Sequence, residues 1–352
     1  MRRSLLAILT VLIFYSVTVA NSLPKNYWSG IFSSDYNSDS VNYSNSTYKI
    51  VIVSSYDPSN PCGSLQVQGI LKAIRYDSEL ANKNVKIRTF YMLSRSRNKT
   101  TYDKINIAKK IVSSVIKYKP NRIITTDDAA FEFVAIPLIL KKYPVTFSGI
   151  NIPLDVYYSR YPELKKCKLT GVIEVVDPKV LKGFFLKIGL TIPSVYVIYD
   201  DLNMFSYYLL DDVKKAFSDY DVEARMVSNK IALSSAIRSP SVSYMTAVFL
   251  YTLALRETID YMEITGIAKQ NNIHDGLLIT INENCVCNCD LALTTDFEKM
   301  GETAYLLLKN NEKRVVKSKT IIVINSCSRK FDKYFSVIER IKEVKIKHCE
   351  SN

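Results

Sequence analysis

The chain has 352 residues, of which 47% are hydrophobic and 23% are charged, a composition that excludes a disordered or fibrous protein. Its 47 Lys and Arg residues outnumber its 34 Asp and Glu residues, which gives a net charge of +13. The basic residues are spread thinly and no recognition motif accompanies them, so we predict no nucleic-acid partner.

The first 47 residues are predicted to lie outside the fold. Arg2 and Arg3 precede a mostly apolar stretch that ends at the small residues Thr18-Val19-Ala20, the pattern of a cleaved signal peptide over residues 1–20. Residues 21–47 are rich in Asn, Ser, Tyr and Asp and are predicted to form a flexible leader. We therefore expect a periplasmic or otherwise extracytoplasmic protein.

Strands and helices are predicted to alternate along the rest of the chain. Continuous apolar runs indicate buried strands, and apolar residues at helical spacing indicate helices. Strands are expected at 48–54, 85–92, 122–126, 144–148, 169–174, 194–199, 222–227, 244–251, 276–281, 291–295 and 319–325. Helices are expected at 65–80, 102–118, 129–142, 178–190, 205–220, 231–239, 254–270 and 297–309. This alternation predicts an α/β fold of two Rossmann-like lobes with parallel sheets.

Polar residues follow several of these strands directly. Ligands bind beyond the carboxyl ends of strands in open parallel sheets, so these residues are the candidate ligand-binding set. Some of them are expected to be helix N-caps instead, because Ser, Thr, Asp and Asn accept hydrogen bonds from the first N–H groups of a helix. The candidates are Ser55, Tyr56, Thr126, Asp127, Asp128, Ser148, Gly149, Asn151, Tyr199, Asp200, Tyr251, Asn282 and Glu283.

Three segments in order resemble one protein family. They are Thr126-Asp127-Asp128-Ala129-Ala130, Tyr143-Pro144-Val145-Thr146-Phe147-Ser148-Gly149-Ile150-Asn151 and Leu169-Thr170-Gly171-Val172. In this order they resemble the substrate-binding proteins of ABC transporters, which have the type 1 periplasmic-binding-protein fold. Leu291-Ala-Leu-Thr-Thr, Gly301-Glu-Thr-Ala and Ile322-Val-Ile-Asn325 resemble the family's closing strand, helix and strand. The resemblance covers residues 48–345.

The resemblance implies two lobes joined by three crossovers near 165–170, 288–292 and 316–320. Lobe one would comprise 45–168 and 291–318, and lobe two 169–290 and 319–345. A small molecule, an amino acid or a related compound, would be trapped by hinge closure between the lobes. It would then be delivered to an inner-membrane ABC permease with its ATPase.

An amino-acid ligand requires three kinds of partner. Asp127, Asp128, Asp200 or Glu283 would pair with its ammonium group, and Tyr56, Tyr199 or Tyr251 would stack on its apolar part. Backbone N–H groups after Asp128, or near Gly63 and Ser64, would hold its carboxylate.

Cysteines at alternate positions in Cys285-Val-Cys-Asn-Cys289 depart from the family pattern. They are consistent with disulfides to Cys327 or Cys62, with free thiols, or with a metal site. A closed zinc site needs four ligands, and the chain has only 2 His residues. With 7 Cys, at least one is unpaired within the chain.

We therefore predict a monomeric, non-enzymatic solute-binding protein without a cofactor or metal. The chain contains no nucleophile-elbow, phosphate-loop or dinucleotide-binding motif. A sensory ligand-binding module that reports to a membrane partner is the first alternative, because the same fold serves both roles. An exported hydrolase is the second.

Overall fold

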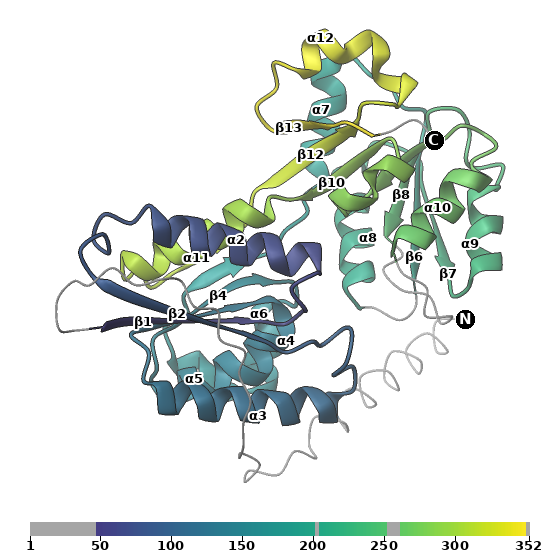
Figure 1. The fold of residues 1–352 in the computed structure, drawn as a ribbon. Coiled ribbons are helices and arrows are strands. Elements are labelled where there is room, and N and C mark those ends of the chain that lie inside the picture. Colours follow the sequence, from purple (N-terminus) through teal and green to yellow (C-terminus); the bar gives the residue numbers. More distant parts are fainter. Residues whose placement is uncertain (1–46, 201–203, 252–260, 350–352) are drawn as a thin grey trace. The chain divides into compact units, whose positions relative to one another are not determined.

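The computed structural model describes residues 47–200, 204–251 and 261–349, which form two units (Figure 1). Of the described residues, the first unit contains those up to Gly171 together with Gly301–Val315, and the second contains those within Val172–Met300 and from Val316 onward. The predicted signal peptide lies outside the described residues. So does the predicted leader, except for Thr47, which begins the first strand.

The first unit is built on a six-stranded sheet with the order β11-β5-β4-β3-β1-β2. Strand β1 runs parallel to both β2 and β3, and β3 runs parallel to β4. The strands are β1 (Thr47–Ser54), β2 (Asn84–Tyr91), β3 (Arg122–Thr126), β4 (Val145–Ile150), β5 (Gly171–Ile173) and β11 (Val315–Lys317).

Strands β1 and β4 lie in the interior of this sheet. The last five residues of β1 and all six of β4 are buried, as expected for strands whose two faces are both covered by helices. Figure 1 shows α2 and α11 on one face of the sheet and α3 and α5 on the other. The Ile and Val residues of these strands therefore form the core of the unit.

Local sequence sets the helix ends of this unit. In α2, the Asn60 side chain accepts a hydrogen bond from the N–H of Gly63, and Pro61 occupies the first helical position. The Thr100 side chain caps α3 in the same way, and Lys119 ends it in the left-handed conformation before Pro120. The helices are α2 (Pro61–Arg75), α3 (Thr101–Tyr118), α4 (Asp127–Ala130), α5 (Ile136–Leu140), α6 (Leu154–Arg160) and the one-turn η2 (Pro162–Lys166).

The predicted helix at 129–142 is continuous but irregular. A π-helical turn, η1 (Phe131–Ala135), separates α4 from α5. Pro137 near the start of α5 has no N–H to donate to the preceding turn, which accounts for a local departure from α-helical bonding.

The second unit is built on a seven-stranded sheet with the order β13-β12-β10-β9-β8-β6-β7. The pairs β6–β7, β6–β8, β8–β9, β9–β10 and β12–β13 are parallel, and β10–β12 is antiparallel. The strands are β6 (Val195–Asp200), β7 (Val222–Val227), β8 (Ala247–Tyr251), β9 (Leu277–Thr280), β10 (Leu291–Thr295), β12 (Thr320–Asn325) and β13 (Val344–Lys347).

The position of β10 corrects the predicted lobe boundary. Residues 291–318 were expected in lobe one, with a crossover at 288–292. Instead, β10 pairs with β9 and β12 in the second sheet, and the chain enters the first unit only after Met300, inside α11 (Phe297–Lys309). The antiparallel pairing with β12 holds Leu291–Thr295 in the second unit.

Two apolar clusters cover the two faces of the second sheet. One joins the sheet to α7 and α8 through Leu181, Phe184 and Val213. The other joins it to α9 and α10 through Leu233, Ala236 and Ile264. The helices are α7 (Pro178–Ile188), α8 (Met204–Ala216), α9 (Lys230–Ile237), α10 (Tyr261–Asn271), α12 (Phe335–Ile338) and the short turns η3 (Glu283–Asn288) and η4 (Arg329–Tyr334).

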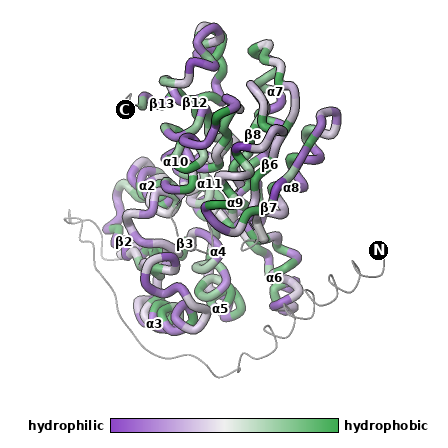
Figure 2. The backbone as a smooth tube through the Cα atoms, turned by 90° about the vertical axis from the view of Figure 1, so that its right-hand side faces the viewer, coloured by the Kyte–Doolittle hydropathy of each residue, from purple (hydrophilic) through white to green (hydrophobic). Residues whose placement is uncertain are grey.

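Hydropathy follows this layering. In Figure 2, hydrophilic and hydrophobic residues alternate around the turns of α3, as expected for a helix that covers a sheet on one side only. Within the described ranges, no helix combines the length and the apolar character needed to cross a membrane.

Candidate ligand-binding site

The carboxyl ends of three strands meet at one edge of the first sheet. Ser54 at the end of β1 is opposite Thr126 at the end of β3, and Thr126 is opposite Ser148 in β4. The loops that follow these strands carry most of the candidate residues from this unit. The parallel register therefore brings together side chains that are far apart in the sequence.

Asp127 has the most unusual environment at this edge. Its side chain is buried, and its φ of 65° lies in the left-handed region that residues other than glycine rarely adopt. Oδ2 of Asp127 makes no hydrogen bond with the described residues. Burial raises the pKa of Asp127 to about 7, and the nearby Asp128 carboxyl adds to the increase. The Thr126 hydroxyl is close enough to the carboxyl to lower its pKa slightly.

Gln66 of α2 holds the other oxygen of Asp127. Its Nε2 donates to Oδ1 of Asp127 at 2.9 Å, and its Oε1 accepts a hydrogen bond from the Ser148 hydroxyl at 2.7 Å. All three side chains are buried. This chain of hydrogen bonds fixes the Asp127 carboxyl and leaves Oδ2 as the oxygen that can receive a donor from a ligand.

Tyr56 and Arg95 lie next to Asp127. The Arg95 guanidinium is 4.5 Å from the centre of the Tyr56 ring, a cation–π distance. Burial raises the pKa of Tyr56 well above its usual value, with Arg95 and Asp127 among the nearby charges. A Cβ on Gly63 would be 3.3 Å from the Tyr56 ring, so the glycine allows the start of α2 to approach this ring closely. The group thus combines a carboxyl, an aromatic ring and a cation.

Asp128 differs from Asp127 because its hydrogen bonds are already made within the unit. It accepts from the backbone N–H groups of Asn151 and Ile152, each at 3.1 Å, from the Asn151 amide at 3.3 Å, and from the Tyr157 hydroxyl at 2.9 Å. Burial nevertheless raises its pKa. These contacts tie the start of α4 to the segment after β4. Gly149, near the end of β4, has a φ of 75°.

Three of the N–H groups proposed to hold a ligand carboxylate, those of Gly63, Ser64 and Ala130, are already bonded. Asn60 accepts from Gly63 through its side chain at 3.2 Å and from Ser64 through its carbonyl at 2.9 Å. The hydroxyl of Ser55 accepts from the N–H of Ala130 at 2.8 Å and donates to the Thr126 carbonyl at 2.7 Å. Arg95, which the sequence did not single out, is the cation beside the site that can take this role.

The second unit carries the candidates Tyr199, Asp200 and Tyr251. Asp200 is buried and accepts a hydrogen bond from the Ser206 hydroxyl at 3.1 Å. The Tyr251 hydroxyl is buried and makes no hydrogen bond with the described residues. The Tyr199 ring packs edge-on against Tyr207 at 5.4 Å. Tyr251 is therefore the candidate in this unit that has a buried polar atom still open to a partner.

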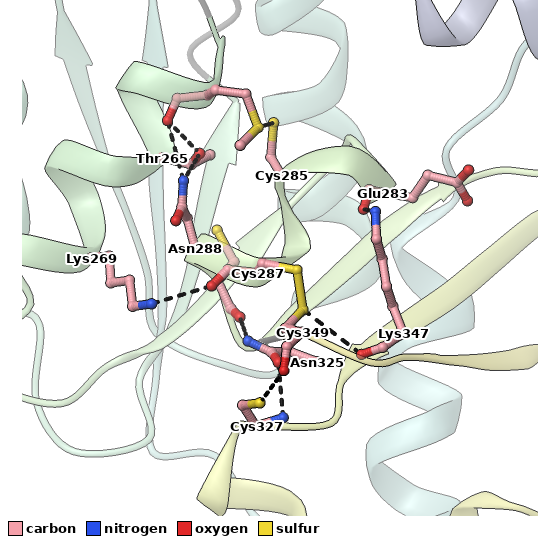
Figure 3. Close-up of a disulfide and its surroundings, with 12 residues drawn as sticks. Thr265, Lys269, Glu283, Cys285, Cys287, Asn288, Asn325, Cys327, Lys347 and Cys349 are labelled. Carbon is pink, nitrogen blue, oxygen red and sulfur yellow. Dashed lines mark hydrogen bonds between the residues drawn. A yellow bond between two sulfur atoms is a disulfide. The ribbon is translucent and has the colours of Figure 1, made fainter. Parts of the chain in front are cut away.

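Asn282 and Glu283 lie at the start of η3, the turn after β9. The Asn282 side chain accepts from the N–H of Asn284 at 3.0 Å, so Asn282 is a cap of this turn. The Glu283 carbonyl accepts from Nζ of Lys347 at 2.9 Å, and Figure 3 shows its carboxylate directed away from the disulfide nearby.

The disulfide partner of the cysteine cluster is Cys349, which corrects the predicted links to Cys327 or Cys62. Cys287 and Cys349 are joined, with Cα atoms 5.5 Å apart (Figure 3). Cys285 and Cys289 are buried thiols outside the disulfide, and the Cys285 thiol donates to Sδ of Met262 at 3.3 Å. Cys327 is an exposed thiol that contacts the Cys349 carbonyl at 2.8 Å. In the described parts of the chain, no group of three or more His, Cys, Asp or Glu residues is arranged to hold a metal ion.

Comparisons with known proteins identify the fold. No protein-family model and no curated protein matches the chain. Solved structures do match. A ligand-free, open substrate-binding protein with adhesive properties from Clostridium difficile has a TM-score of 0.59 at 16% identity, covering 86% of this chain and 100% of that one. An ABC domain in complex with L-Trp from Streptococcus pneumoniae has a TM-score of 0.57 at 16% identity, covering 85% and 100%.

A regulator shares the same architecture. A LacI transcriptional regulator from Bacteroides fragilis has a TM-score of 0.51 at 8% identity, covering 82% of this chain and 99% of that one. The two mostly parallel sheets with interleaved helices are those of these proteins. The chain has the two-unit α/β fold of type 1 periplasmic binding proteins, as the sequence predicted.

Proposed function

We propose that the protein is an extracytoplasmic solute-binding protein that captures an amino acid or a related zwitterion and delivers it to an ABC permease with its ATPase. It acts as a monomer and carries out no catalysis. The observation that carries this proposal is the Asp127 carboxyl, which is buried and held from one side by Gln66. Its other oxygen makes no hydrogen bond with the described part of the chain.

Leaving a carboxylate oxygen buried and unbonded costs free energy, about 1–3 kcal/mol or more. The left-handed backbone at Asp127 adds to this cost. A ligand ammonium group would satisfy Oδ2 and favour the ionised carboxyl. The strained, unsatisfied aspartate is therefore better explained as a group prepared for a ligand than as a structural residue like Asp128.

The neighbours of Asp127 favour a zwitterion over a simple cation. Arg95 supplies a positive charge for a ligand carboxylate, and the Tyr56 ring supplies an apolar surface for a side chain. The complex with L-Trp reported for the similar structure from Streptococcus pneumoniae is consistent with this ligand class.

The disulfide supports the proposed compartment. Disulfides persist in oxidising environments such as the periplasm or the cell exterior and are rare in the cytosol. The Cys287–Cys349 link thus fits the N-terminal signal peptide predicted from the sequence.

We further propose that the second unit completes the site and closes over the ligand, with Tyr251 as its first candidate contact. The Tyr251 hydroxyl is a buried donor without a partner in the described chain. Burial raises the pKa of Tyr251 well above 10, so the hydroxyl would act as a neutral donor at physiological pH.

The test begins with the bound molecule. Mass spectrometry of the small molecules released by denaturing the purified protein identifies ligands that co-purify. Calorimetric titration with L-tryptophan and the other amino acids then measures affinity. Asp127→Asn is expected to weaken binding about tenfold to a hundredfold, because a charge-assisted hydrogen bond contributes about 1.5–3 kcal/mol.

Asp128→Asn is the matched control, because it changes the adjacent residue in the same way. It weakens four hydrogen bonds within the unit and should lower the melting temperature. If Asp127→Asn lowers stability and leaves affinity unchanged, Asp127 is structural and the proposed site is wrong. If no co-purifying molecule and no amino acid binds, the proposed ligand class is wrong.

A sensory module would show the same binding behaviour, because it would use the same site. The two roles differ in what happens to the ligand. Loss of ligand uptake in cells that lack the protein supports transport, and unchanged uptake with an altered transcriptional response supports sensing.

A further inference from the structure

A cavity in the first unit lies at the opposite end of the strands from Asp127. It has a volume of about 80 Å³ and lies among the starts of β3 and β4, the segment before β5 and the C-terminal half of α11. Arg122 begins β3 and Thr126 ends it, so at about 3.3 Å per residue the cavity is about 13 Å from the candidate ligand site. The two sites are therefore separate.

Two buried polar atoms of residues that line this cavity have no partner. The Thr146 side chain is 1% exposed, and its hydroxyl makes no hydrogen bond with the described residues. Nε of Arg122 is also buried and makes no hydrogen bond with the described residues, whereas Nη1 of the same side chain donates to the Asn121 carbonyl at 3.3 Å. Buried donors without acceptors are rare in folded proteins, so each indicates a missing partner.

The strand register places both side chains on the same face of the sheet. Alternate residues of a strand point to the same face, so Thr146 shares a face with Ser148, whose hydroxyl bonds to Gln66 of α2. Gly301 of α11 packs against the Gln66 backbone, and Leu307 and Leu308 of the same helix line the cavity. The cavity therefore lies between the sheet and α11.

The charges around the cavity favour an anion. Arg122, Lys168 and Lys313 line it, together with a single carboxylate, that of Glu312. Hydrogen bonds from Asn310 and Arg314 lower the pKa of Glu312, and its carboxylate is thus already engaged. The Thr170 hydroxyl is also used, because it donates to the Glu312 carbonyl at 3.0 Å. Both unsatisfied groups can donate a hydrogen bond, and the nearby charge is mainly positive.

The volume limits the size of the occupant. A water molecule occupies about 30 Å³ of liquid, so a cavity of about 80 Å³ admits two or three waters or one small oxyanion. We propose that this cavity binds a small inorganic oxyanion such as phosphate or sulfate. Arg122 and Thr146 donate to the oxyanion, and Lys168 and Lys313 neutralise its charge. The bound anion links the amino ends of β3 and β4 to the loop after α11.

The test uses inorganic phosphate and sulfate as probes on the whole protein. At pH 7 and constant ionic strength, phosphate or sulfate is expected to raise the melting temperature along a saturation curve, whereas chloride is not. Phosphorus NMR of the phosphate signal provides an independent measure of binding. Arg122→Gln should abolish the effect, and Thr146→Val should weaken binding at least fivefold.

Arg225→Gln is the control for non-specific attraction of anions. Arg225 lines a larger cavity of the second unit together with Lys230 and Arg238, so this variant loses the same charge at a different place. It should bind phosphate as the unmodified protein does. Thr146→Val should be at least as stable as the unmodified protein without phosphate, because it removes an unsatisfied buried hydroxyl.

Two results would overturn the proposal. One is the absence of a saturable response to both oxyanions, which would mean that water alone fills the cavity. The other is an equal response in Thr146→Val and in the unmodified protein, which would place the anion elsewhere. Lys168→Gln replaces Arg122→Gln if the arginine variant does not fold, and should weaken binding. Neither result bears on the amino-acid site, which titration with amino acids tests separately.

Discussion

Asp127 and Asp128 are adjacent in the sequence but have different surroundings. Both follow a buried strand, and either could be a helix cap or a ligand contact from its position alone. The structure separates them because Asp128 receives hydrogen bonds from the segment after β4, whereas Asp127 receives one from α2. These partners come from distant parts of the chain, so the sequence around Asp127 and Asp128 does not predict them.

Gln66 and Arg95 were missed by the sequence analysis for the same reason. Gln66 lies in the middle of α2 and is fully buried, so the only local signal is a polar residue on a helix face that otherwise packs on the sheet. Arg95 lies in a turn after β2 among other basic residues. The strand ends could be predicted from apolar runs, but which side chains converge on them depends on tertiary packing.

The raised pKa of Asp127 predicts how stability changes with pH. The folded protein, in which the pKa is about 7, holds a proton that the unfolded chain releases near pH 4. The free energy of unfolding should therefore fall as the pH rises from about 4 to about 7 and level off above this range. Urea denaturation at a series of pH values measures this, and Asp127→Asn should reduce the slope.

Ligand affinity should change in the opposite direction. An ammonium group binds the ionised carboxyl, so affinity for the amino-acid ligand should increase about tenfold between pH 6 and pH 8. Calorimetric titration at both values measures this, and Asp127→Asn should show no such increase. An equal affinity at both values in the unmodified protein would contradict an ammonium contact at Asp127.

At the scale of elements, the sequence predicted most strands and helices and misplaced one of them. The strand at 222–227 agrees with β7, and the helix at 102–118 agrees with α3 to within one residue. Strand β10 was placed in the wrong lobe because an apolar run such as Leu291–Thr295 is buried in either sheet. Its antiparallel pairing with β12 places β10 in the second sheet, and strand pairing depends on the tertiary structure.

Two helical glycines should respond in opposite ways to alanine. A Cβ on Gly301 in α11 would be 2.1 Å from the Gln66 carbonyl oxygen, whereas a Cβ on Gly183 in α7 would meet nothing within 4 Å. Gly301→Ala should lower the free energy of unfolding by about 1–3 kcal/mol, because backbone atoms must move apart. Gly183→Ala should raise it by about 0.5–1 kcal/mol. Urea denaturation of both variants measures these changes.

Gly301→Ala should also weaken ligand binding. The Gln66 backbone that it would displace carries the side chain that holds Asp127. A variant that loses stability and keeps full affinity would show that the position of Gln66 does not control the site.

At the scale of the whole molecule, the chain passes between the units three times, after Gly171, Met300 and Val315. If the second unit closes over the ligand as proposed, ligand should reduce the radius of gyration. Small-angle scattering with and without saturating ligand measures this, and Asp127→Asn at the same ligand concentration should show a smaller decrease. An unchanged radius at saturation would indicate a site that the first unit forms alone.

The three crossings also constrain the order in which the protein can be assembled. The first unit needs the part of α11 from Gly301 onward, which covers one face of its sheet and contacts α2. This part follows the 129 residues of Val172–Met300 in the sequence. A chain emerging from a ribosome or a membrane channel therefore cannot complete the unit that begins first until most of the other has appeared. Until Gly301–Val315 emerges, residues 47–171 expose the part of their sheet that α11 covers, and exposed apolar surface makes a partly synthesised domain prone to aggregate.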